Sequence, residues 1–152
     1  LYDAIDAIRY NLGKAATGGL RLENFDHPFD YTIEVLTDEG AVTRSVDLVE
    51  TFNYLYGIVV DRYEYPVNPK DGNRQYVVVR GHRLNGKPVW VVWRDTTGFD
   101  KKTALDKEQA FLEGLKSDAP ADCELLANGD TLARGFGSLD GLFKRLMFAE
   151  TE

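Results

Sequence analysis

Apolar and polar residues alternate along this chain with two different periods, and the changes of period predict a succession of helices and strands. Apolar residues at helical spacing within residues 1–12 predict an amphipathic first helix, and Gly18-Gly19 would end it. No N-cap residue precedes this helix, so we expect it to continue from a preceding domain. The pattern therefore divides the chain into a helix with its connector, residues 1–23, and one accessory α/β domain, residues 24–152.

Five strands are expected in the second part. Residues Tyr31–Leu36 alternate between apolar and polar, which is typical of a strand with one solvated face. The other four are Ile58–Tyr65, Gln75–Arg80, Pro88–Arg94 and Cys123–Ala127. Asn85-Gly86 indicates a β-hairpin with a type I′ turn before Pro88–Arg94. The run from Val89 to Trp93 is apolar on both faces, as expected for a central strand that is covered on both sides.

Three helices are expected between and after these strands. In the first, residues 46–56, Asp47 and Glu50 have capping-box spacing, and Gly57 suits the left-handed residue that follows a helix. The second covers about Leu105–Lys116, and Ser138 is expected to cap the third. The strand–helix–strand order around the second helix predicts a crossover between two parallel strands. The predicted fold class is therefore α+β: a mixed sheet of about five strands, with a βαβ crossover and helices packed against it.

Charge is distributed unevenly. The chain carries a net charge of −7, yet residues 60–102 contain nine Lys or Arg against five Asp or Glu, a balance of +4. A strongly acidic body repels DNA, so nonspecific DNA binding by the whole domain is not expected. The basic middle is either a solvated hairpin face or a nucleic-acid contact. The candidate DNA-contacting residues are Arg74, Arg80, Arg83 and Lys87.

Cys123 is the only cysteine, so no internal disulfide forms, and a reducing, cytoplasmic location is expected. No apolar run approaches the roughly 20 residues that span a bilayer, so a membrane is not an expected partner.

Four phrases of the sequence occur in an order that is informative. They are VDLVETFNYLYG (Val46–Gly57), VWVVWRDT (Val89–Thr96), ANGD (Ala127–Asp130) and SLDGLFKRLMF (Ser138–Phe148). Together they resemble the C-terminal region of type III-like (Mod) adenine-specific DNA methyltransferases. The resemblance implies a parent enzyme of a restriction–modification system that transfers a methyl group from S-adenosylmethionine to adenine N6. It also implies DNA as a partner of the parent, and a restriction subunit or self-association for this region.

The two motifs that such an enzyme needs are missing. The loop that holds a flipped adenine has the pattern [D/N]-P-P-[Y/F], and the nearest match, Asp26-His27-Pro28-Phe29, has His at the second position. The Gly-rich turn of the cofactor site has its nearest match in Gly135–Ser138, where Ser138 replaces a glycine. We therefore expect no catalytic residue and no cofactor in this fragment, and an assembly or docking role for it.

Polar residues follow two strands that are expected to be parallel neighbours. Trp93, Arg94 and Asp95 end one strand, and Asn128 and Asp130 follow the other. Ligands bind outside the carboxyl ends of such strands in open α/β sheets. These residues therefore form either a polar site or an internal network in which Arg94 pairs with Asp95 or Asp130.

Other chemistry has weaker support. Asp61, Asp95 and Asp130 invite a Mg²⁺-dependent nuclease hypothesis, but Glu64 lacks the lysine of the usual nuclease pattern. His27, His82 and Cys123 lie far apart in sequence and predict no metal site. Six apolar residues on the first and third of the expected helices are candidates for core or interface: Phe52, Tyr54, Tyr56, Phe143, Met147 and Phe148.

Overall fold

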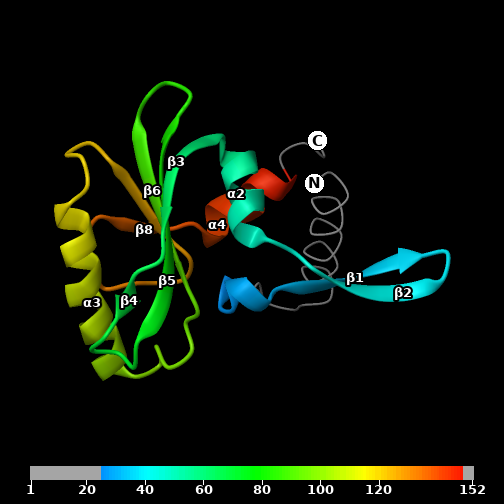
Figure 1. Cartoon of the computed structure of the whole chain (residues 1–152), viewed down its shortest axis with the longest axis horizontal. Helices are drawn as coiled ribbons and strands as arrows, with labels where there is room; N and C mark the ends of the chain where they lie inside the picture. The colour runs from blue at the N-terminus through cyan, green and yellow to red at the C-terminus, as the bar shows by residue number, and fades with distance from the viewer. Residues whose placement is uncertain (1–24, 149–152) are drawn as a thin grey trace.

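The computed structural model describes residues 25–148, so the predicted first helix lies outside the described residues. Figure 1 shows three layers, in which a sheet lies between α3 on one face and α2 with α4 on the other, and a two-stranded arm that projects from this body. The elements are η2 (Pro28–Asp30), β1 (Thr32–Thr37), β2 (Gly40–Ser45), α2 (Leu48–Tyr56), β3 (Ile58–Glu64), β4 (Val67–Asn68), β5 (Arg74–Arg83), β6 (Pro88–Arg94), α3 (Lys102–Ser117), β7 (Glu124–Ala127), β8 (Phe136–Ser138) and α4 (Asp140–Phe148).

The main sheet is mixed, and its order confirms the predicted fold class. The strands lie in the order β3-β5-β6-β7-β8, with β4 paired to β5. The pairs of β3 with β5 and of β5 with β6 are antiparallel, whereas β6 with β7 and β7 with β8 are parallel. The chain passes from β6 through α3 to β7, which is the expected βαβ crossover.

The first predicted strand does not belong to this sheet. Residues Tyr31–Leu36 were expected among its strands, but β1 pairs only with β2, in a separate two-stranded sheet. Sequence reasoning missed β2 because all six of its residues are exposed, so no buried face imposes a period of two. It also missed β8, whose three residues, Phe-Gly-Ser, have no strand-like pattern.

Two hydrophobic cores lie on the two faces of the sheet. On one face, Phe52 of α2 contacts both Trp93 of β6 and Phe143 of α4, with ring centroids 6.0 and 5.4 Å apart. On the other face, Leu112 of α3 packs in a cluster that includes Tyr76 and Trp90. The residues of β6 from Val89 to Trp93 are all buried, which confirms the prediction of a strand covered on both sides.

The two cores show which of the six apolar residues predicted to lie in the core or at an interface are buried. Phe52, Phe143 and Met147 are fully buried and belong to the core. Tyr54 is 51% exposed and Tyr56 is half-buried, and of Phe148 the structure describes the backbone alone.

Helix α2 begins and ends as its sequence predicts. The Asp47 carboxylate accepts a hydrogen bond of 3.0 Å from the backbone N–H of Glu50, and Gly57 adopts φ 74° at the end of the helix. Glu50 does not complete a capping box, because its carboxylate accepts a hydrogen bond from the Tyr63 hydroxyl instead. Helix α4 begins at Asp140, whose N–H donates to the Ser138 hydroxyl at 3.4 Å.

The β5–β6 hairpin is present, but the predicted type I′ turn is wrong. That turn requires positive φ at both central residues, whereas within residues 25–148 the only non-glycine residue with positive φ is Asn73. Gly86 has φ 87°, its N–H donates to Arg83 O at 2.8 Å, and Arg83 N–H donates to Lys87 O at 2.9 Å. The connection therefore has three residues, and Gly86 supplies the left-handed one.

Gly81 marks a place where β3 and β5 tolerate no side chain. A Cβ atom there would lie 2.5 Å from Val59 O and 2.7 Å from Ile58 Cγ2. We expect Gly81→Ala to destabilise the fold by about 1–3 kcal/mol, because backbone atoms must move to accept the methyl group. Chemical unfolding monitored by Trp fluorescence measures this change. The matched control is Gly114→Ala on the exposed side of α3, where a Cβ meets no atom within 4 Å and the gain in helix propensity is up to about 1 kcal/mol. Equal stability of the two variants would contradict the expected clash.

Candidate functional site

The carboxyl end of β6 carries a buried ion pair. Arg94 and Glu108 are both 0% exposed. Nε of Arg94 donates to Oε2 of Glu108 and Nη2 donates to Oε1, each at 2.8 Å. This bidentate geometry matches the planar guanidinium to the carboxylate, and it joins strand β6 to helix α3.

Asn128 extends the network to β7 and to the start of the described residues. Its Oδ1 accepts the backbone N–H of Arg94 at 2.9 Å, and its Nδ2 donates to Arg94 O at 2.8 Å. The same Nδ2 donates to Phe25 O at 2.7 Å. The buried side-chain amide of Asn128 thus connects the residues after β7 to the end of β6 and to the backbone at Phe25.

The other groups around the pair complete its hydrogen bonding. The Tyr76 hydroxyl donates to Oε2 of Glu108 at 2.8 Å, and Nη2 of Arg94 donates to Asp130 O at 2.7 Å. Burial, followed by the charge of Glu108, raises the pKa of Tyr76, so this hydroxyl stays protonated and acts as a donor. The ring of Phe99 lies 5.1 Å from the Arg94 guanidinium carbon. The network is therefore closed to solvent and saturated by the protein's own groups.

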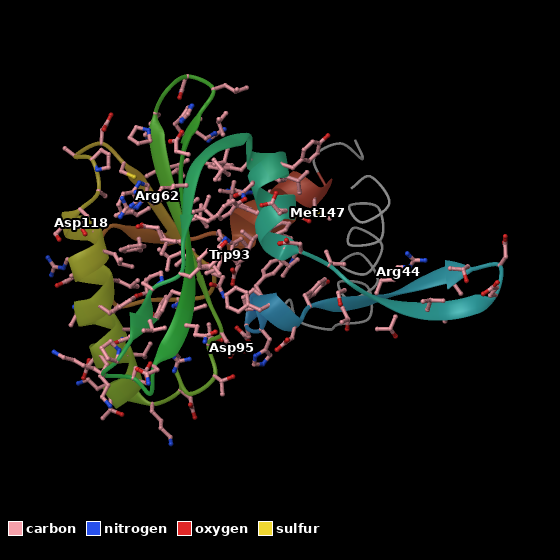
Figure 2. All side chains as sticks on the ribbon, viewed as in Figure 1. Arg44, Arg62, Trp93, Asp95, Asp118 and Met147 are labelled. Atoms are coloured by element: carbon pink, nitrogen blue, oxygen red, sulfur yellow. The ribbon has the colours of Figure 1, made fainter. Side chains whose placement is uncertain are left out.

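The predicted strand-end residues separate into three groups. Arg94 and Asn128 meet in the buried network, and Asp130 joins it through its backbone oxygen. Asp95 faces outward, where it accepts hydrogen bonds from Thr97 and lies 3.0 Å from Nδ1 of His27. Trp93 is buried on the opposite face, toward α2, as Figure 2 shows.

The predicted partner of Arg94 is wrong, because the pair is with Glu108 and not with the carboxylate of Asp95 or Asp130. Sequence reasoning missed Glu108. It lies four residues before Leu112 and three after Leu105, on the apolar side of α3. A charged residue at such a position signals a buried partner.

A second carboxylate is drawn inward at the start of α4. Both oxygens of Asp140 accept the backbone N–H of Gly129, at 3.1 and 3.2 Å. Burial raises the pKa of Asp140 above its ordinary value, and the nearby carboxylates of Asp26 and Asp130 add to this effect. Asp140 thereby ties the turn after β7 to α4.

The four basic residues proposed to contact DNA do not share one face. Arg74 lies at the other end of β5 from Arg83, pairs with Asp71 at 2.7 Å and donates to Asp95 O. Arg80 pairs with Glu64 and lies over Trp90, on the α3 side of the sheet. Arg83 lies over Tyr56, on the α2 side. Lys87 is exposed in the hairpin turn.

Within residues 25–148, no three His, Cys, Asp or Glu side chains lie close enough to hold a metal ion. The nuclease hypothesis requires the carboxylates of Asp61, Asp95 and Asp130 to lie together. Asp61 lies 3.1 Å from Nδ1 of His82, near one end of β5, whereas Asp95 lies near the other end. Burial raises the pKa of the Cys123 thiol to about 11, so it is protonated near neutral pH and is a poor nucleophile. The described residues therefore offer the nuclease hypothesis no metal site.

No protein-family model, curated protein or solved structure matches this chain. Each helix in the described part of the chain is too short or too polar to cross a membrane.

Arg94→Met tests the buried pair. Removing the guanidinium leaves the buried Glu108 carboxyl group without its partner, so we expect a loss of stability of about 3–5 kcal/mol in urea unfolding. Glu108→Leu should have a similar effect. The double variant, Arg94→Met with Glu108→Leu, should be clearly more stable than the sum of the single losses predicts, because it leaves no unpaired buried charge. Additive losses would show that the two side chains are not coupled.

His27→Gln tests the contact outside the network. The hydrogen bond to Asp95 raises the pKa of His27, so protonated His27 stabilises the fold below pH 6.5, and this contribution disappears as pH rises through the folded-state value. We expect the substitution to lower the melting temperature more at pH 5.5 than at pH 8, by a small amount because both side chains are partly exposed. In an Asp95→Asn background this pH dependence should vanish, and its persistence there would assign it to another group.

Proposed function

We propose that this chain is a non-catalytic accessory module of an adenine-N6 DNA methyltransferase of the type III-like kind, and that its work is assembly. The parent enzyme would supply the S-adenosylmethionine site and the contact with DNA. The module would pack against a restriction subunit or a second copy of the protein. A cytoplasmic setting goes with this proposal, as does the single, free cysteine.

The observation that carries the proposal is the position of the four phrases that resemble this family. They correspond to α2, to β6 with the residues after it, to the turn after β7, and to α4. Phe52, Trp93 and Phe143, one from each of three phrases, form one aromatic cluster. Arg94 and Asn128, from two of the phrases, take part in the buried polar network, whose other members Glu108 and Tyr76 lie outside them. The phrases thus supply many of the residues that pack the domain, which supports a structural role for the region that they define.

The two segments whose sequences are most similar to the catalytic motifs both make structural contacts within this domain. Asp26 O accepts the backbone N–H of Thr96 at 2.9 Å, and buried Pro28 begins η2. In the second segment, residues 136–138 form β8, paired with β7. These contacts give residues 26–29 and residues 135–138 a role in packing, and this supports the proposal that neither segment takes part in methyl transfer.

The coding sequence around this segment tests the assignment. We expect it to encode, before Leu1, a methyltransferase core with a [D/N]-P-P-[Y/F] motif and a Gly-rich cofactor turn. The purified chain should neither bind S-adenosylmethionine in calorimetry nor methylate oligonucleotides. A coding sequence without such a core would remove the assignment, and methylation by the chain alone would remove its non-catalytic role.

DNA binding distinguishes assembly from the alternative of a DNA-contacting hairpin. We expect fluorescence anisotropy to give only nonspecific affinity for a labelled duplex at physiological salt, with a dissociation constant of about 100 µM or weaker, because the net charge is −7. Arg83→Ala and Lys87→Ala should leave this affinity unchanged. A clear loss in both variants, with a salt dependence reduced by about one ion per lost phosphate contact, would favour the hairpin as a DNA-binding element.

A further inference from the structure

The arm, residues 32–45, consists of β1 and β2 and extends away from the layered body (Figure 1). Among the described residues its two strands pair only with each other. A hydrogen bond of 3.0 Å from Val46 N–H to Tyr31 O closes its base. An isolated two-stranded ribbon is marginally stable in water, and three or more strands with a covered face are usually needed. The arm therefore has the form of an element that is completed by another strand.

Within residues 25–148, no strand covers the outer edge of β2, so this edge is open to such pairing. All six of its residues are exposed, and Leu36 and Val42 expose apolar side chains on the arm. Proteins usually protect an edge strand with proline, a bulge or several charges. Strand β2 contains no proline, pairs with β1 without a register shift, and carries a single charge, that of Arg44.

The charges of the arm are arranged so that they complement a reversed copy of themselves. Asp38 and Glu39 occupy the tip, and Arg44 lies near the base. The Thr37 hydroxyl donates to Gly40 O at 2.9 Å and accepts the N–H of Glu39 at 3.2 Å, which holds the tip in one conformation. An antiparallel partner strand with the same sequence would bring its acidic tip close to Arg44, at the root of this arm.

We propose that β2 pairs antiparallel with β2 of a second copy of this chain, so that the two arms form a continuous four-stranded sheet. In the register centred on Val42, this residue lies opposite Val42 of the other copy. Arg44 then lies opposite Gly40 of the other copy, the residue that directly follows the turn with Asp38 and Glu39. The acidic tip is therefore within reach of the long Arg44 side chain, and the contact occurs twice by symmetry. The acidic tip makes DNA an unfavourable occupant of this edge.

The pairing identifies a second copy of this chain as the partner in the assembly role proposed above, and it rests on that proposed role. Its test measures association alone, so it can fail while the methyltransferase assignment stands, and the reverse also holds.

A charge-exchange experiment tests the pairing. Sedimentation velocity of the full chain, from low to several hundred micromolar, should show a monomer–dimer equilibrium. Arg44→Asp and Asp38→Arg should each weaken the dimer about tenfold or more, because each places like charges at both symmetric contacts. An equimolar mixture of the two single variants should regain the affinity, since each copy then carries the charges that the other lacks.

Lys87→Asp is the control, because it makes the same change of charge as Arg44→Asp, in the turn between β5 and β6. It should leave the dimer unchanged, and circular dichroism should be the same for all variants. A chain that stays monomeric at every concentration overturns the pairing, whether the edge is covered by residues 1–24 or by a different protein. The pairing is also overturned if the arm substitutions leave the dimer affinity unchanged, or if the mixture of the two variants does not regain the wild-type affinity.

Discussion

The ion pair between Arg94 and Glu108 is the interaction on which the arrangement of the body depends. Both side chains are wholly buried, and removing two charges from water is costly unless each finds several partners. The surroundings meet this demand with a tyrosine hydroxyl, a side-chain amide and a backbone carbonyl. Since these groups come from β5, β6, α3 and the residues after β7, the pair specifies how those elements meet.

The network also explains how the two faces of the sheet are coordinated. Trp93 and Arg94 are consecutive on β6, so their side chains point to opposite faces. Trp93 enters the core beneath α2 and α4, and Arg94 anchors α3. Asn128 holds the backbone of Arg94 from both sides, through its N–H and its carbonyl oxygen. A shift of β6 by one residue would exchange the two side chains between the faces and place a charge in the aromatic core.

Parts of this fold that arise from local or repetitive physics could be predicted from the sequence. The unbroken apolar run of β6 predicted double coverage, and Asp47 and Gly57 predicted both ends of α2. The parts that depend on distant partners could not. The position of Glu108 on the apolar side of α3 signals a buried partner but does not identify it, so the predicted partner of Arg94 was wrong. Strand β2 has no buried face, and therefore no period that a sequence pattern would reveal. Of the candidate site, Arg94 and Asn128 were foreseen as members of an internal network, whereas Glu108 and Tyr76, which complete it, were not.

The carboxyl ends of parallel strands are where open α/β sheets usually bind ligands, because loops diverge there and leave a crevice. Here the corresponding space is occupied. Asn128 bridges β6 to Phe25 O, the Asp140 carboxylate accepts the N–H of Gly129, and Asp26 O accepts the N–H of Thr96. The polar groups that a ligand would require already satisfy one another, and a ligand that displaced them would leave buried charge unpaired. Recognition by this domain is then expected at its periphery, and the arm is the described element whose backbone is least committed to the body. In the proposed pairing, the sheet with its closed strand ends is the rigid support, and the arm that projects from it makes the contact with the second copy.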